Sequence, residues 1–284
     1  MRAAYRTRGP GPALLYVKSL GGDDQSLRQP WSERELAIVA QRFYVPGTYT
    51  VNQQLQLNAE RSNYLCRTLR QKNGDRVEIF DGIGNVFACE IVANDPRQTA
   101  LTVVTQTAKA MAPGIRLGVA IGLIKGQPMD RAIAQATELG ATDIYLLDGQ
   151  RSNLKLNEQR MAGKLQHWQK VIVASCEQCG QINLPNLHNP SRLAPLLSRL
   201  TQSGAHLIFF HPQGNPTPKQ LVTGDRVVFI GPEGGFSPEE LNAFAEHQIE
   251  GYRLGPLTLR AETMPAVALA LIHQASGWPT AATD

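Results

Sequence analysis

The stretch VVFIGPEGGFSPEE, residues 227–240, places a glutamate in a glycine-rich turn between an apolar strand and a helix. Such turns often bind phosphate, because their backbone N–H groups close around an anion. This turn lacks the Gly-Lys-Ser/Thr ending of a Walker loop and the G-x-G-x-x-G spacing of a dinucleotide fingerprint. The Glu233 carboxylate would also repel a phosphate. The turn therefore indicates either a ligand without phosphate or an ordinary strand-to-helix connection.

Two further loops are expected beside this turn. The segment HPQGNP follows an apolar strand that ends at Phe210, and the segment YRLGPLTLRAETMP, residues 252–265, precedes the last helix. Parallel sheets bind ligands in crevices at the carboxyl ends of their strands, so these loops should face one ligand. Ser237, with Glu240 three residues later, forms a capping box that starts the intervening helix near Pro238.

The elements that position these loops alternate regularly from residue 115 onward. Continuous apolar strands such as RLGVAIGLI, TDIYLLD, AHLIFF and RVVFIG are separated by helical segments such as PMDRAIAQATELG and LQHWQKVIVASCEQ. This alternation predicts an α/β domain whose parallel sheet is covered by helices on both faces.

Residues 41–107 have a different pattern, with short alternating strands broken by Asp-Gly and Gly-Asn. These breaks indicate hairpins, and the segment predicts a small β-barrel-like domain with one helix, NAERSNYLCRTLRQKNGD. The basic residues of that helix, Arg67 and Arg70 among them, form either a face for RNA or a solvated surface. Residues 108–114 are the expected linker. Residues 1–40 are expected to be a flexible extension that touches RNA, or the product of a gene start placed upstream of Val39.

The composition is that of a globular protein, with 284 residues of which 42% are hydrophobic and 18% charged. Apolar runs stay well short of the roughly 20 residues that span a bilayer, so no membrane association is expected. The net charge of +4 permits RNA binding without requiring it. Four cysteines are typical of a cytoplasmic protein rather than a disulfide scaffold. The single pair Cys176 and Cys179 lacks a second pair at zinc-binding spacing, so no metal is expected.

Taken in order, the motifs RFYV, DG.G, KG, TELG, RS, EQCG, IGPEGGFS and LG…LRAET resemble the SPOUT methyltransferases, and within them the RsmE-type 16S rRNA uridine-N3 methyltransferases. The resemblance covers about residues 41–280. It implies an N-terminal PUA-like RNA-binding barrel and, over residues 115–284, a SPOUT domain with a deep trefoil knot. It also implies a cytoplasmic homodimer that uses S-adenosylmethionine to methylate N3 of a uridine in 16S rRNA of the small ribosomal subunit.

The same resemblance assigns the cofactor to the three loops. A sulfonium ion is cationic, so Glu233 is tolerable beside it; alternatively Glu233 makes a local cap or salt bridge. The cofactor-binding residues that the resemblance implies are Phe210, His211, Gly231, Pro232, Glu233, Gly234, Gly235, Leu254, Gly255, Leu259, Arg260 and Thr263.

Two residues of the last loop are the catalytic candidates. Uracil N3 carries a proton at neutral pH, so the reaction needs a base or a cation that stabilises the uracil anion. Arg260 suits the second role, or else forms a phosphate or intersubunit ion pair. Glu262 is either a base or an acid that complements the dipole of the last helix, and we favour the helix role.

The RNA-binding candidates are Arg42, Arg67, Arg70, Lys125 and Arg151. The chain departs from the family pattern at Gln135, Gln181, Met264 and Pro265, and the absence of an arginine at position 181 places the target base in question. Two alternatives therefore stay open, a SPOUT methyltransferase for another RNA and a non-catalytic RNA-binding protein of ribosome assembly.

Overall fold

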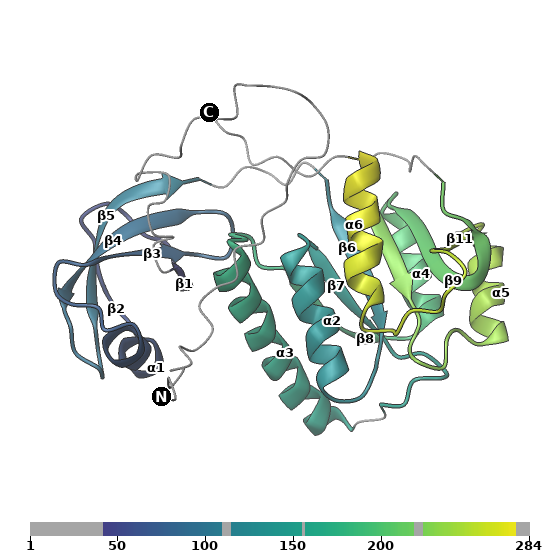
Figure 1. The fold of residues 1–284 in the computed structure, drawn as a ribbon, viewed down its shortest axis with the longest axis horizontal. Helices are drawn as coiled ribbons and strands as arrows, with labels where there is room; N and C mark the ends of the chain where they lie inside the picture. Colours follow the sequence, from purple (N-terminus) through teal and green to yellow (C-terminus); the bar gives the residue numbers. More distant parts are fainter. Residues whose placement is uncertain (1–41, 110–114, 155–156, 219–223, 277–284) are drawn as a thin grey trace, which may run out of the picture. The chain divides into compact units, whose positions relative to one another are not determined.

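The computed structural model describes residues 42–109, 115–154, 157–218 and 224–276. The predicted N-terminal extension and most of the predicted linker lie outside these ranges. The described residues form a mixed five-stranded sheet followed by a parallel six-stranded sheet with helices on both faces (Figure 1). The predicted fold class, a small β domain followed by an α/β domain, is therefore confirmed.

The five-stranded sheet has the strand order β1-β3-β4-β5-β2. β1 runs parallel to β3, and the other neighbours are antiparallel. The inward side chains of its strands, such as Val77, Ile79 and Leu101, form the core of this domain. The short β2 escaped prediction because Leu55 is its single apolar residue. The strands are β1 (Arg42–Tyr44), β2 (Gln54–Gln56), β3 (Arg76–Phe80), β4 (Val86–Ala93) and β5 (Ala100–Ala108).

The helix of this domain changes its winding halfway along. The α-helix α1 (Ala59–Asn63) begins at Asn58, whose side chain accepts a hydrogen bond from the Arg61 N–H at 2.9 Å. It continues directly into a π-helical turn, η2 (Tyr64–Thr68), where the Leu69 N–H donates to the carbonyl of Tyr64. The sequence predicted one helix, because neither periodicity nor capping signals the wider turn.

The six-stranded sheet has the order β11-β9-β10-β6-β7-β8, and all of its neighbouring strands are parallel. Its polar edge strand β8, with the sequence NLHNPS, was not predicted, because it lacks the apolar run of the central strands. The strands are β6 (Leu117–Gly122), β7 (Asp143–Leu147), β8 (Asn186–Ser191), β9 (His206–Pro216), β10 (Arg226–Ile230) and β11 (Glu250–Arg253). The helices are α2 (Gln127–Glu138), α3 (Glu158–Cys179), α4 (Leu193–Gln202), α5 (Pro238–Glu246) and α6 (Met264–Ser276).

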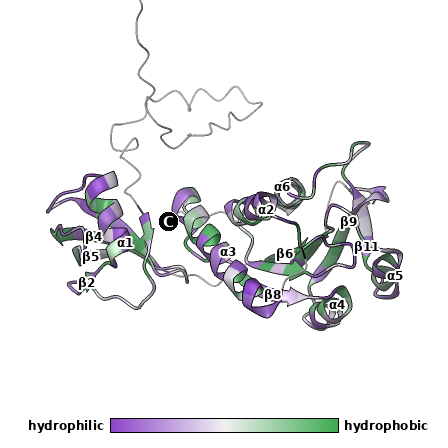
Figure 2. Ribbon diagram, turned by 90° about the horizontal axis from the view of Figure 1, so that it is seen from below, coloured by the Kyte–Doolittle hydropathy of each residue, from purple (hydrophilic) through white to green (hydrophobic). Residues whose placement is uncertain are grey.

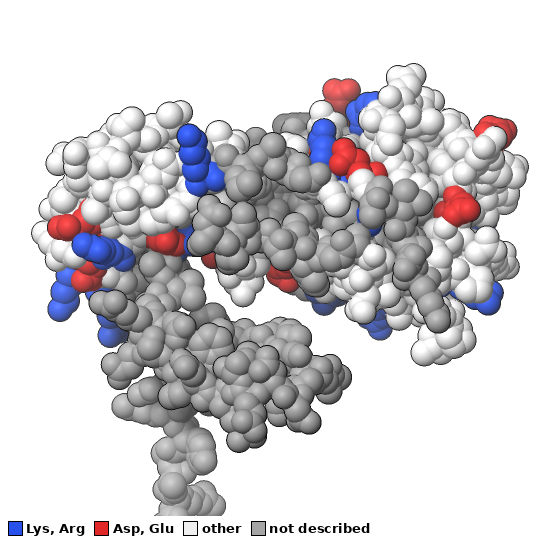
Figure 3. Space-filling model, turned by 90° about the horizontal axis from the view of Figure 1, so that it is seen from above, with Lys and Arg blue, Asp and Glu red and all other residues white. Residues whose placement is uncertain are grey.

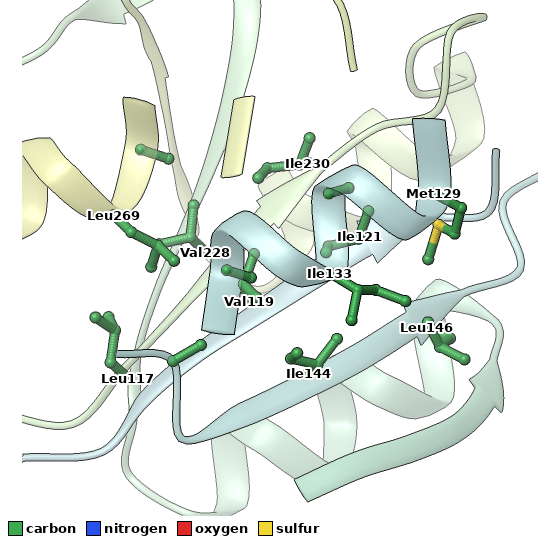
Figure 4. Packing of buried hydrophobic residues seen from close by; sticks show 14 of the residues in the cluster. Leu117, Val119, Ile121, Met129, Ile133, Ile144, Leu146, Val228, Ile230 and Leu269 are labelled. Atoms are coloured by element: carbon green, nitrogen blue, oxygen red, sulfur yellow. The ribbon is translucent and has the colours of Figure 1, made fainter. Parts of the chain in front are cut away.

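Two hydrophobic cores lie on opposite faces of this sheet. On one face, α2, α3 and α6 cover residues such as Val119, Ile121 and Val228, which point toward the helices in Figure 4. On the other face, α4 and α5 cover a second cluster that contains Phe229 and Phe244. Figure 2 shows hydrophobic colouring along β6, whereas α3 carries both hydrophobic and hydrophilic residues. The central strands are therefore buried on both faces, as continuous apolar runs predict.

A buried carboxylate, that of Asp143, forms hydrogen bonds that join the amino-terminal ends of neighbouring strands in this sheet. The Asp143 side chain is 3% exposed. It accepts hydrogen bonds from Arg116 at 3.0 Å, Thr142 at 2.9 Å and Asn186 at 3.3 Å, and His188 Nε2 lies 2.9 Å from it. Burial raises the pKa of Asp143, but the hydrogen bonds from His188, Thr142 and Arg116 and the Arg116 charge outweigh burial and hold that pKa well below its usual range.

This network makes the fold sensitive to acid. A carboxyl whose folded pKa lies below its unfolded value of about 3.9 stabilises the fold above that pH, and this contribution is lost as the pH falls further. We expect Asp143→Asn to lower the free energy of unfolding at pH 7 by about 2–4 kcal/mol and to flatten its decline below about pH 4. Urea unfolding from pH 2 to 7 measures both effects. Exposed Glu246→Gln is the control, and equal pH profiles for Asp143→Asn and wild type would contradict this account.

No helix among the residues that the structure describes is long and apolar enough to cross a membrane.

Candidate functional site

Two loops and strand β9 enclose a cleft of about 730 Å³ at one edge of the six-stranded sheet. The prediction that the apolar strand ends at Phe210 is wrong, because β9 continues through HPQGNP to Pro216. β9 and the residues after β10 and β11 supply most of its walls, so the segments that the sequence placed at one edge do converge. β11 lies beside β9 rather than β10, yet its loop still reaches the glycine turn. The lining residues are Pro128, Arg151, Phe210, His211, Pro212, Ile230, Gly231, Pro232, Glu233, Gly234, Gly235, Phe236, Tyr252, Arg253, Leu254, Gly255, Leu257, Thr258, Leu259, Arg260, Ala261, Glu262 and Met264.

Nearly all residues predicted for the cofactor and for catalysis line this cleft. Thr263 does not line it; its N–H donates to the Arg260 carbonyl at 3.0 Å in the turn before α6. Of the RNA-binding candidates, Arg151 lines the cleft, and Lys125 lies before α2. Leu257 and Thr258 line the cleft within the predicted cofactor loop of residues 254–263. Tyr252, at the end of the preceding strand, was not predicted for the site, because a single aromatic residue in a strand is usually part of the core.

The glycine turn is held by the first turn of α5. Ser237 Oγ accepts a hydrogen bond from the Glu240 N–H at 3.1 Å, and Glu240 Oε2 accepts one from the Ser237 N–H at 2.8 Å, which confirms the predicted capping box. The other carboxylate oxygen, Oε1, accepts the N–H of Gln150 at 3.0 Å. Glu240 is 5% exposed and therefore joins the loop after β7 to the glycine turn. Only the capping role was readable from the sequence.

Glu240→Gln should loosen this junction. The amide keeps one acceptor oxygen but turns an N–H donor toward one of the two backbone N–H groups, which leaves that group without its partner. We expect the free energy of unfolding to fall by about 1–3 kcal/mol in urea titrations. Glu239→Gln removes the same charge from an exposed position of the same turn, and we expect it to leave the free energy of unfolding close to the wild-type value. Equal effects of the two substitutions would contradict the junction.

Close backbone approach sets the inner wall of the cleft. A Cβ atom built on Gly122, the last residue of β6, would lie 2.3 Å from the Pro232 nitrogen and 2.8 Å from the Gly231 carbonyl carbon. Gly235 has φ +67°, which favours glycine. Arg151 Nη1 donates to the Gly234 carbonyl at 3.1 Å, so the arginine also braces the turn from outside.

The charged residues of the cleft differ in whether they are paired with other residues. Glu233 and Arg260 are exposed, and no hydrogen bond or ion pair of the Arg260 guanidinium occurs within the described ranges. Glu262, in contrast, accepts from Arg131 of α2 at 3.4 Å, and its side chain is 12% exposed. This pairing supports a structural part for Glu262 at the entry to α6. Arg260 and Arg253 both line the cleft with exposed side chains, so both cations are available to a ligand.

His211 is held in a defined state. Burial lowers the pKa of His211, so the ring is neutral at pH 7. The Gln213 N–H donates to His211 Nδ1 at 3.3 Å, which places the remaining ring proton on Nε2. The ring therefore offers the cleft a neutral donor.

The remaining RNA-binding candidates lie in the small β domain. Arg67 and Arg70 are exposed, whereas Arg42 donates to Glu78 at 2.7 Å and to the Gly180 carbonyl at 3.0 Å. On the face drawn in Figure 3, Lys and Arg side chains lie singly among acidic and uncharged residues. Basic character on this face is therefore spread out rather than gathered into one patch, as the small net charge suggests.

Comparison with known proteins identifies the class to which this cleft belongs. The model described as "RNA methyltransferase domain" matches residues 112–273, and the model described as "RNA methyltransferase PUA domain" matches residues 57–103. The first match spans more than half of the chain. The chain belongs to the RNA methyltransferase family, which confirms the resemblance inferred from its motifs.

Individual relatives agree with this family. The chain is 26% identical over 234 residues to "Ribosomal RNA small subunit methyltransferase E" of Buchnera aphidicola, an alignment that covers 82% of this chain and 95% of that protein. A methyltransferase from Legionella pneumophila, solved with bound SAM, is 28% identical with a TM-score of 0.76, covering 84% of this chain and 99% of that one. A Neisseria gonorrhoeae ribosomal RNA small subunit methyltransferase E is 22% identical, also with a TM-score of 0.76, covering 84% and 98%, and it supports the fold.

Proposed function

We propose that the protein methylates N3 of a uridine in 16S rRNA, with S-adenosylmethionine as the methyl donor. One observation carries the proposal: the two loops that hold the family motifs IGPEGGFS and LRAET close on a single cleft together with Phe210 and His211 of β9. The relatives named for small-subunit rRNA methylation, and the SAM-bound structure at 28% identity, support the substrate and the cofactor.

The residues of the cleft suit S-adenosylmethionine. Backbone groups of the glycine turn and the Leu254 loop supply donors and acceptors at fixed angles for an adenine edge. Glu233, which disfavours a phosphate, is compatible with a cation. When bound, the cofactor supplies an electrophilic methyl group on a positively charged sulfur.

The protein's own part in the reaction is to position the base and stabilise its charge. Loss of the N3 proton leaves negative charge on the uracil ring, and we assign its stabilisation to the Arg260 guanidinium. Glu262 is a weaker candidate for the base, because its carboxylate is already paired with Arg131. N3 lies on the Watson–Crick edge, so the target uridine must be unpaired when it enters the cleft.

Substrate recognition is assigned to both domains. Arg67 and Arg70 of the small β domain, with Lys125 and Arg151 near the cleft, are proposed to contact RNA phosphates. From the SPOUT resemblance we also propose that the α/β domain contains a trefoil knot and that the protein forms a homodimer. Because the proposed substrate is the small ribosomal subunit, we propose a cytoplasmic location. Arg42 is proposed to act chiefly through its protein contacts, because both ends of its guanidinium are engaged.

Mass spectrometry of 16S rRNA tests the proposal. A strain that lacks the gene should lose 3-methyluridine from 16S rRNA, and purified protein with S-adenosylmethionine should restore it on small subunits from that strain. If 3-methyluridine persists and another RNA loses a methyl group, the enzyme acts on that RNA. If no methylation changes and calorimetry detects no binding of S-adenosylmethionine, the protein is a non-catalytic RNA-binding protein.

A further inference from the structure

Five of the family motifs contribute no residue to the cleft. Besides KG and TELG, these five include three motifs that contact one another. They are RFYV at residues 42–45, DGIG at residues 81–84 and EQCG at residues 177–180. The structure brings all three together where α3 ends, between the small β domain and the six-stranded sheet. Their shared place indicates a function apart from cofactor binding.

Glu177, near the end of α3, makes the central contacts of this junction. Its Oε1 accepts the Tyr44 N–H of β1 at 2.9 Å, and its Oε2 accepts from Arg61 Nη1 of α1 at 2.9 Å. The Glu177 and Arg61 side chains are 16% and 26% exposed, so solvent screens the pair only in part. One carboxylate thus holds both a strand and a helix of the small β domain.

Arg42 makes a second contact with the same end of α3. Its Nε and Nη2 donate to Glu78 Oε2 at 3.1 and 2.7 Å, which fixes the guanidinium against β3. Its Nη1 then donates to the carbonyl of Gly180 at 3.0 Å. Gly180 ends α3 with φ +86°, so glycine is the residue that best presents this carbonyl.

Backbone pairing supplies the third contact. The Leu184 N–H donates to the Gly82 carbonyl at 2.9 Å, and the Gly84 N–H donates to the Ile182 carbonyl at 3.2 Å. Asp81 Oδ1 accepts the Ile83 N–H at 2.9 Å, which keeps the β3–β4 turn in the shape that this pairing needs. The turn therefore joins the segment after α3 in the manner of a short strand.

We propose that this joint, made by Glu177, Arg42 and the residue 81–84 turn, holds the small β domain in one orientation and so determines which RNA nucleotide reaches the cleft. The inference rests on the proposed function. Interfaces between domains usually permit relative motion. Directional bonds to three separate elements restrict rotation as well as distance, which a hydrophobic contact alone does not. Glu177 is therefore a positioning residue, because it acts on RNA through the domain that it holds.

Glu177→Gln is the sharpest test, since it keeps the shape of the side chain but turns a donor amide toward the Arg61 guanidinium. In methylation assays on small ribosomal subunits, we expect the KM for subunits to rise about tenfold, equivalent to about 1.4 kcal/mol. The rate at saturation and the Kd of S-adenosylmethionine should stay within about twofold of wild type. Glu158→Gln, an exposed position at the other end of α3, should leave all three values unchanged.

A charge exchange separates positioning from simple loss of stability. Glu177→Arg combined with Arg61→Glu should have a lower KM than Glu177→Arg alone, because the ion pair is restored in reverse. It should stay above the wild-type KM, because an arginine at position 177 cannot accept the Tyr44 N–H. A normal KM in Glu177→Gln would overturn the proposal, and so would equal losses of subunit affinity, rate and cofactor affinity that follow the loss of thermal stability.

Two further measurements test the joint without relying on methyl transfer, so they apply even if the enzyme methylates another RNA. Hydrogen exchange at the Tyr44, Gly84 and Leu184 amides should accelerate in Glu177→Gln, whereas amides of the glycine turn should exchange as in wild type. Filter binding should show the same tenfold loss of subunit affinity. If wild type transfers no methyl group to subunits, the proposed function fails; unchanged exchange and unchanged subunit binding in Glu177→Gln would instead overturn the joint.

Discussion

Replacing Arg260 by alanine should lower the methylation rate at saturating substrate by about two to three orders of magnitude and leave the Kd of S-adenosylmethionine within about twofold of wild type. Arg260 lines the cleft, is exposed, and makes no ion pair with any residue in the described ranges. Its charge is therefore available to an anion that forms during reaction. The positive sulfur of the cofactor is not stabilised by a nearby cation, and we assign Arg260 to the uracil anion rather than to the cofactor's carboxylate, so cofactor affinity should hardly depend on Arg260.

Single-turnover methylation of small ribosomal subunits and calorimetry with S-adenosylmethionine measure the two quantities separately. Arg260→Lys should recover part of the rate, because it keeps the charge but loses the planar guanidinium. A lysine variant as slow as the alanine variant would indicate that two parallel N–H donors are essential. Full activity of Arg260→Ala would remove this residue from the mechanism, and a large loss of cofactor affinity would assign it to binding instead.

The order of the central strands and helices was predictable, because a strand that is buried on both faces has a continuous apolar sequence. All six residues of β6 are buried, and its run of apolar residues shows this without any alignment. Edge strands are harder to predict, because their sequences need not be apolar. β8 pairs with β7 on one side alone and has a polar sequence. The π-helical turn could not be predicted, because it depends on one hydrogen bond from the Leu69 N–H to the Tyr64 carbonyl, five residues back instead of four.

The site was predictable as a set of loops but not as a set of contacts. Loops after parallel strands must share an edge, so the convergence of the glycine turn and the Arg260 loop follows from topology. Contacts between residues distant in sequence do not follow in this way. Nothing near Glu240 indicates that it reaches Gln150, and nothing near Glu262 indicates its partner Arg131. The choice between a base and a structural acid therefore required the fold.

Gly122 illustrates the same limit for a residue without functional groups. In sequence it is a glycine at the end of an apolar strand, which usually marks a turn or a close approach without saying to what. In the structure it is the point where β6 meets the glycine turn, and a Cβ there would lie 2.5 Å from Pro232 Cδ as well as 2.3 Å from the Pro232 nitrogen. Carbon–nitrogen contacts this short do not persist, so one of the two segments must move.

Gly122→Ala should therefore displace the glycine turn rather than the strand. β6 is fixed between β10 and β7, and Leu123 beyond it donates to the Leu147 carbonyl at 2.9 Å. Relief of the clash moves the turn by on the order of 1 Å, a misplacement that costs about 10²-fold in a positioned site. We expect the Kd of S-adenosylmethionine to rise about 100-fold in calorimetry. The free energy of unfolding should fall by about 1–3 kcal/mol, as overpacking typically costs.

Gly163→Ala is the matched control for this substitution. Gly163 lies within α3, and a Cβ built there meets no atom within 4 Å. Alanine should stabilise the helix by about 0.5–1 kcal/mol and leave cofactor affinity unchanged, so the same chemical change has the opposite sign at the two positions. If Gly122→Ala binds S-adenosylmethionine as tightly as Gly163→Ala does, the turn accommodates a methyl group, and the close approach of β6 is not what shapes the cleft.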